Sequence, residues 1–90
     1  MVGTNGIDKI DAKSGNDVAC GLGGNDTLGG VGGNDLLFGD AGNDTLKGGG
    51  NDDTLTGGIG ADVFNGEGGI DTATDFNPAE GDTQTNVENF

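Results

Sequence analysis

Small or apolar residues recur at every ninth position along most of this chain. They are Ile10, Ala19, Leu28, Leu37, Leu46, Leu55, Phe64 and Ala73. The segments between them are polar and rich in glycine, so the sequence has no long apolar segment to form a conventional core. A fixed period of this length predicts a repeat architecture, in which each unit adds one side chain to a shared interior.

Each nine-residue unit divides into a tight turn and a very short strand. The first six residues are dominated by Gly, Asn and Asp and contain no Pro, which is typical of turns. The last three, such as Thr27-Leu28-Gly29, are expected to form a strand whose middle residue faces inward. The clearest units are GLGGNDTLG (21–29), GVGGNDLLF (30–38) and GDAGNDTLK (39–47), whereas 3–11 and 12–20 are degenerate, as terminal repeats often are.

The fourth position of the unit carries a conformational signal. It is glycine in every unit except one, where Asn51 takes its place. Asn is the non-glycine residue that best tolerates a left-handed backbone, so the substitution predicts a positive φ at this position.

Two units make one coil of 18 residues, with a strand on each side. Successive coils should stack at about 4.8 Å, the ordinary spacing between hydrogen-bonded strands. Parallel strands connected in this way are expected to wind right-handedly. The sequence therefore predicts an all-β fold, a right-handed parallel β-roll (β-solenoid) of about four 18-residue coils over residues 1–74.

The last 16 residues depart from the period and are expected to form a C-terminal capping tail, 75–90, or the start of a further module. Asn77 is a suitable N-cap, Pro78 suits the first helical position and Glu80 the third, so one helical turn is predicted. Phe76 is positioned to plug the open end of the roll. The stretch 86–90 resembles the beginning of another module.

Composition excludes several classes of function. Sixteen Asp and Glu against three Lys give a net charge of −13 on 90 residues, which disfavours nucleic acid and anionic membrane surfaces as partners. No apolar run is long enough to span a bilayer. With no His and one Cys, zinc sites and the usual nucleophile–base pairs are not available, so catalysis is not expected.

An aspartate stands two positions before each inward residue. The eight are Asp8, Asp17, Asp26, Asp35, Asp44, Asp53, Asp62 and Asp71. One inward side chain per unit buries too little apolar surface to offset the ordering of a glycine-rich backbone and the repulsion of so many negative charges. The chain should therefore need a multivalent cation that binds only its folded form, and carboxylates beside turn carbonyls indicate calcium first.

The copies GGNDTL, GGNDLL, AGNDTL and GGIGAD resemble the repeats-in-toxin, or haemolysin-type, calcium-binding nonapeptides over residues 3–74. The resemblance implies a structural calcium-binding module in which ions lie between adjacent turns on each edge of the roll. Each ion is then held by the sixth-position Asp of two successive turns and by backbone carbonyls. Calcium accepts six to eight oxygens in flexible geometry, whereas magnesium demands a tighter octahedron and should compete poorly.

Carried onto this chain, the resemblance implies two series of aspartates. One edge pairs Asp8 with Asp26, Asp26 with Asp44 and Asp44 with Asp62; the other pairs Asp17 with Asp35, Asp35 with Asp53 and Asp53 with Asp71. Carbonyl ligands are expected from turn residues Gly21, Gly23, Gly30, Gly32, Gly39 and Ala41. This makes up to six calcium sites, those that involve Asp8 or Asp71 being the least complete.

The resemblance also implies export, because such modules usually belong to secreted proteins that leave the cell by a type I route and fold outside it. We expect a calcium-bound monomer that supports a parent protein. The alternative is a carbohydrate-binding or adhesive module that uses an outer sheet face, for example around Leu36 and Phe38. A flexible acidic linker fits the composition but not the regular period, and an enzyme is the weakest hypothesis.

Overall fold

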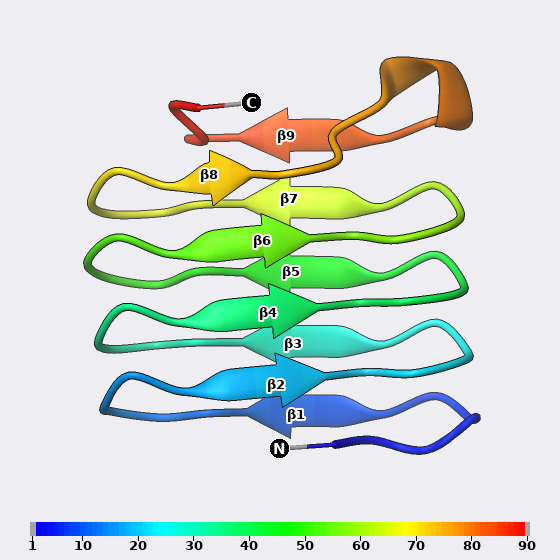
Figure 1. Ribbon diagram of the computed structural model, residues 1–90, viewed down its shortest axis with the longest axis horizontal. Helices are drawn as coiled ribbons and strands as arrows, with labels where there is room; N and C mark the ends of the chain where they lie inside the picture. The colour runs from blue at the N-terminus through cyan, green and yellow to red at the C-terminus, as the bar shows by residue number, and fades with distance from the viewer. Residues whose placement is uncertain (1, 90) are drawn as a thin grey trace.

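The computed structural model describes residues 2–89 and shows two parallel β-sheets that face each other across a thin interior (Figure 1). The strands are three residues long, except for β8, which has two. One sheet contains β1 (Lys9–Asp11), β3 (Thr27–Gly29), β5 (Thr45–Lys47), β7 (Val63–Asn65) and β9 (Thr83–Thr85). The other contains β2 (Val18–Cys20), β4 (Leu36–Phe38), β6 (Thr54–Thr56) and β8 (Thr72–Ala73).

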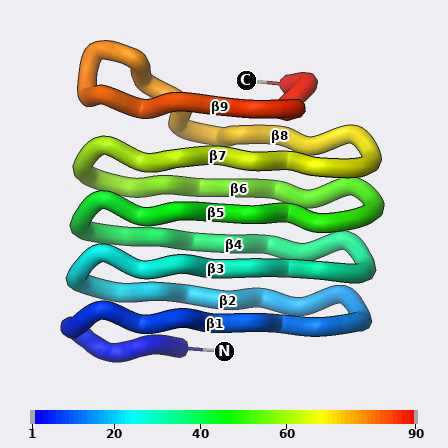
Figure 2. Tube along the Cα trace, turned by 180° about the vertical axis from the view of Figure 1, so that it is seen from behind, coloured from blue at the N-terminus to red at the C-terminus, as the bar shows by residue number. Residues whose placement is uncertain are grey.

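The chain winds from one sheet to the other and back, so that neighbouring strands of a sheet are one coil apart. Leu28 pairs with Leu46, and Leu37 pairs with Leu55, both at a separation of 18 residues. Figure 2 shows the coils from behind as a regular stack with a turn at each edge. The prediction of an all-β solenoid of about four 18-residue coils is confirmed.

The interior is a single column of side chains supplied by the middle residue of strands β1 to β7 and by Ala73 of β8. Leu28, Leu37, Leu46 and Leu55 have no exposed surface, and neither has Phe64. Ala19 and Ala73 continue the column at its two ends, and Ile10 is only partly buried. Each coil thus buries little apolar surface, as the sequence predicted, and packs only against the coils beside it.

The turns use a left-handed backbone at two positions of the unit. The fourth position has positive φ at Asn51 and at six glycines, namely Gly15, Gly24, Gly33, Gly42, Gly60 and Gly69, which confirms the prediction in every unit except the first, where Gly6 departs from it. The second position also has positive φ and was not predicted. Its residues are Lys13, Leu22, Val31, Asp40, Gly49, Gly58 and Glu67. Their chemical variety hides the requirement, because most of them are not residues that favour this conformation.

The tail begins with the predicted helical turn. Residues Pro78–Glu80 form one 3-10 turn, and the side chain of Asn77 caps it by accepting a hydrogen bond from the amide of Ala79 at 3.0 Å. Phe76 packs edge-on against Phe64, with ring centroids 6.0 Å apart. Strand β9 then pairs with β7, so the chain adds part of a fifth coil above β8 (Figure 1). Phe90, at the end of the stretch that resembles a further module, lies outside the described residues.

Candidate metal centre

The periodic aspartates form one series along each edge of the roll. Six of them are at most 2 % exposed: Asp26, Asp35, Asp44, Asp53, Asp62 and Asp71. Asp8 and Asp17, in the first coil, are only partly buried. Carboxylates are seldom buried to this extent unless another group compensates their charge.

One carboxylate oxygen of each inner aspartate is used to join adjacent coils. The Oδ1 atom of Asp44 accepts a hydrogen bond from the backbone amide of Asp26 at 2.8 Å, and Asp62 does the same for Asp44. On the other edge, Asp53 accepts from the amide of Asp35 at the same distance. We call these two series the aspartate ladders. The residue pairs expected from the sequence are therefore direct neighbours in the fold.

The second oxygen of these aspartates is buried and has no hydrogen-bond partner among the described residues. The unpartnered Oδ2 atoms belong to Asp17, Asp26, Asp35, Asp44, Asp53, Asp62 and Asp71. Burying a carboxylate oxygen without a hydrogen-bond donor costs folding free energy. A proton or a cation bound to each of these atoms would remove that cost.

Backbone carbonyls from the first position of the unit lie close to the Oδ2 atoms. A Cβ atom built on Gly48 would be 2.6 Å from Asp53 Oδ2 and 3.0 Å from the carbonyl oxygen of Gly66, in the next coil. Gly39 has the same surroundings, with Asp44 Oδ2 at 2.5 Å and the Gly57 carbonyl at 2.8 Å. Only glycine leaves this space open. We call the space between two successive aspartates of a ladder and this carbonyl a gap, and each gap is lined by the hard oxygens that calcium prefers.

The predicted carbonyl donors occupy two different places. Gly21, Gly30 and Gly39 are buried at the first position, beside the aspartate ladders. Gly23, Gly32 and Ala41 stand at the third position, on the half-buried or exposed rim of the turn. At this rim the amide of Gly32 donates to the carbonyl of Lys13 at 3.0 Å. The carbonyls of Gly48, Gly57 and Gly66 have the same position as the first group and were not named from the sequence.

Burial also changes the acidity of the ladder. It raises the pKa of Asp53 and Asp62 from 3.8 to about 7 and that of Asp44 to about 6, against the opposing effect of the backbone hydrogen bond that each accepts. The pKa of Asp71 is raised for the same reason. Without a cation, therefore, several of these carboxyls bind a proton at a higher pH in the folded roll than in the unfolded chain.

The fifth position of the unit forms a second series of hydrogen bonds that sequence reasoning missed. Asn16 Oδ1 accepts from the amide of Asn34 at 2.8 Å, and Asn25 accepts from the amide of Asn43 in the same way. Asp52 continues this series by accepting from the amide of Ile70, so this exposed carboxylate also joins two adjacent coils. The repeated Asn at the fifth position was the available signal.

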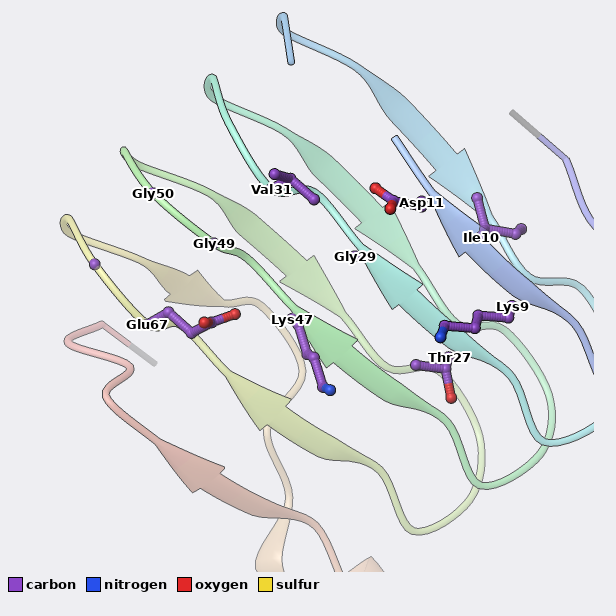
Figure 3. A pocket seen from close by; sticks show the side chains of 11 residues that line it. Lys9, Ile10, Asp11, Thr27, Gly29, Val31, Lys47, Gly49, Gly50 and Glu67 are labelled. Carbon is purple, nitrogen blue, oxygen red and sulfur yellow. The ribbon is translucent and has the colours of Figure 1, made fainter. Parts of the chain in front are cut away.

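A hollow of about 450 Å³ lies on the outer face of the sheet that contains β1, β3 and β5 (Figure 3). It forms where Gly29 leaves an outward position without a side chain. Lys9 and Lys47, two of the three lysines in the sequence, line it together with Thr27. This feature was not predicted, because glycine at an outward strand position resembles the glycines of the turns.

Two other kinds of site are absent from residues 2–89. No three or more His, Cys, Asp and Glu side chains converge there as a metal-binding group, so an ion between two coils depends on carbonyls as well as on paired aspartates. No helix in this part of the chain is long and apolar enough to cross a membrane.

Comparison with protein families gives a match to the model of the RTX calcium-binding nonapeptide repeat, which describes four copies of the unit. The match covers residues 2–37 and again 38–73. Both stretches contain the aspartates, the first-position glycines and the inward residues described above. No curated protein and no solved structure matches the chain.

Proposed function

The chain belongs to the RTX calcium-binding nonapeptide repeat family, and on this basis we propose that it is a structural module whose folding is driven by several calcium ions. The observation that carries the proposal is the set of seven buried Oδ2 atoms that have no partner within the described residues. A β-roll with these atoms left unpaired is unfavourable, and a cation that binds only the folded chain removes the penalty.

The proposed ligands are the aspartates of two successive coils and the first-position carbonyl between them. In one gap these are Asp35, Asp53 and the carbonyl of Gly48. Calcium supplies the positive charge that neutralises the two carboxylates. Oδ1 of Asp53 keeps its hydrogen bond from the amide of Asp35 in the preceding coil, so the same side chain fixes the register and binds the ion. Six such gaps would bring the net charge of −13 close to zero.

A calcium titration followed by circular dichroism tests the proposal. We expect a disordered spectrum in chelator and a steep rise in β-structure as calcium is added, because every inner aspartate serves two gaps. Magnesium at the same concentration should produce little change, since its small octahedral shell fits these gaps poorly. A chain that is equally folded in excess chelator would refute calcium-driven folding.

We further propose that the module works outside the cell as part of a larger secreted protein exported by a type I route. Members of this family typically belong to secreted proteins, and low cytosolic calcium would keep the chain unfolded until export. Detecting the full-length protein in washed cells and in culture medium, with and without the export machinery, tests this localisation.

A polysaccharide-binding role is the second candidate, and the hollow beside Gly29 favours it. Lys9, Lys47 and Thr27 offer donors, and Asp11 and Glu67 offer acceptors, to the hydroxyls of a neutral sugar polymer. A Cβ on Gly29 would meet only the Ile10 carbonyl, at 3.9 Å, so Gly29→Val should fill the hollow without disturbing the strand. With calcium constant, that variant should lose affinity for a soluble neutral polysaccharide, while Thr45→Val, elsewhere on the same sheet, should not.

A further inference from the structure

The C-terminal coil continues both aspartate ladders with residues outside the nine-residue period. On the edge that carries Asp62, the next carboxylate comes 20 residues later: Asp82 Oδ1 accepts from the amide of Asp62 at 2.7 Å. On the other edge it comes 17 residues later, where Glu88 Oε1 accepts from the amide of Asp71 at 2.9 Å. Asp82 and Glu88 therefore occupy the sixth-position place of the last coil.

At the Asp82 end the last carboxylate itself is paired at both oxygens, although Asp62 Oδ2 beside it has no partner among the described residues. Asp82 Oδ2 accepts from the amide of Asn77 at 2.9 Å, so both of its oxygens are in use. The carboxylate at the other end of this edge is also paired, because Asp8 Oδ2 accepts from the amide of Thr4 at 2.6 Å. Neither terminal carboxylate has the unpartnered oxygen that the inner ones have.

The Glu88 end has the surroundings of an inner gap. Asp71 is fully buried, and its Oδ2 atom has no partner within residues 2–89. A Cβ built on Gly66 would collide with this atom and with the carbonyl oxygen of Asn86. Asn86 thus takes the place that the carbonyl of Gly66 has beside Gly48 in the preceding gap.

A shortened turn explains why a glutamate stands here. Gly66 donates to the carbonyl of Thr85 at 2.9 Å, as Gly48 donates to Asn65 at 2.8 Å, so Asn86 starts the last turn. Asn89 then donates to the carbonyl of Asp71 at 3.0 Å, as Thr72 does to Asp53. The turn between them has three residues, 86–88, where the repeats have six. The extra methylene of Glu88 lets its carboxylate reach the amide of Asp71 from this shorter loop.

We propose that Asp71, Glu88 and the carbonyl of Asn86 form a further calcium site, which closes one edge of the roll and lies outside the nonapeptide motif. The inference rests on the proposed calcium-binding function. Oε1 of Glu88 accepts the ladder hydrogen bond from the amide of Asp71, and Oδ2 of the same Asp71 is buried without a partner among the described residues. Two carboxylates so placed need a cation between them, as in the inner gaps.

The variant Glu88→Gln tests whether Glu88 is a calcium ligand or only a hydrogen-bond acceptor. Gln keeps a side-chain oxygen for the amide of Asp71 but loses the charge. Equilibrium dialysis with elemental analysis at saturating calcium should therefore find one ion fewer per chain than in the wild type. Glu80→Gln, in the exposed 3-10 turn, is the matched control and should bind the wild-type number.

An unchanged ion count in Glu88→Gln would overturn the site and leave Glu88 as a ladder acceptor only. A crystal structure of the calcium-loaded wild-type chain gives a readout that does not depend on the variant folding. Density for an ion between Asp71 and Glu88 is expected there, and its absence beside occupied inner gaps would also overturn the site. A wild-type chain that binds no calcium would instead refute the proposed function itself.

Discussion

At the scale of the residue, the two oxygens of each ladder aspartate have separate roles. Oδ1 accepts the amide of the coil before it, and Oδ2 remains buried without a partner among the described residues. The first-position glycine makes room for this second oxygen. A substitution that preserves Oδ1 but removes the charge can therefore separate register from calcium binding.

Asp35→Asn is such a substitution, because the amide oxygen can still accept from Asp17. We expect it to weaken two neighbouring gaps at once and to raise the calcium concentration at the folding midpoint by about tenfold, equivalent to about 1.4 kcal/mol. Asp40→Asn is the control, since Asp40 is exposed and Asn tolerates its φ of 66°. Equal midpoints in circular dichroism titrations of the two variants would contradict the assignment.

At the scale of the element, the turn is defined by two left-handed positions, of which only one is visible in the sequence. The fourth position selects glycine because a Cβ on Gly33 would collide with the carbonyl of Gly15 in the coil below. At the second position the crowding varies from unit to unit: a Cβ on Gly49 would collide with the carbonyl of Val31, yet Leu22 and Val31 are present at φ of 67° and 70°. A crowded backbone position can be predicted when it selects glycine in nearly every unit, as the fourth position does. Backbone strain at the second position cannot be predicted in this way, because many different residues adopt the strained conformation there.

Val31→Gly should relieve that strain. A left-handed backbone costs a β-branched residue about 1–2 kcal/mol, of which the entropy of glycine in the unfolded chain cancels about half. We expect the calcium-loaded protein to gain up to about 1 kcal/mol, seen as a higher midpoint of thermal unfolding. Val18→Gly, in strand β2, should destabilise the protein, because the extended backbone there carries no left-handed strain for glycine to relieve. A loss of stability in both variants would count against strain at position 31.

The tail marks the other limit of prediction from the sequence. Asn77 and Pro78 form a local signal, and the turn they predict is present. The nine-residue step leads from Asp71 to Glu80, so the period itself predicts neither Asp82 nor Glu88 as a ladder residue. Two added residues before Asp82 and three missing residues before Glu88 move the carboxylates out of the period, and only the hydrogen bonds of the coils restore their equivalence.

At the scale of the whole molecule, stability depends on charge more than on the narrow apolar column. Buried carboxylates stand in series along both edges, and the three lysines cannot compensate them. Protons and calcium therefore compete for the same oxygens. Removing both should leave the roll with uncompensated buried charges, which the interior cannot offset.

This competition predicts opposite pH behaviour with and without calcium. Burial raises the pKa of Asp53 and Asp62 to about 7, so the calcium-free folded form binds more protons than the unfolded chain. Its stability is therefore greatest below about pH 4 and is lost as the pH rises towards 7. In calcium-free buffer, acidification from pH 7.5 to 4.5 should increase the β-structure seen by circular dichroism.

The calcium-loaded form should be insensitive to pH above about 5, because its carboxylates are ionised like those of the unfolded chain. Asp53→Asn, which is neutral at every pH, should weaken the acid response of the calcium-free chain. A calcium-free chain that loses β-structure on acidification would show that burial of the charged ladder carboxylates does not control folding.

The 18-residue register also sets a unit of length for this molecule. Leu46 stands over Leu28, and Lys47 stands over Gly29, because one whole coil separates them. Insertion or loss of a complete coil would leave every later residue on its own sheet and edge. Insertion or loss of nine residues would move every later strand to the opposite sheet, so the lysine-lined face and the opposite face would exchange partners. Such a protein can therefore vary in length only in steps of two repeats if its faces are to keep their identity.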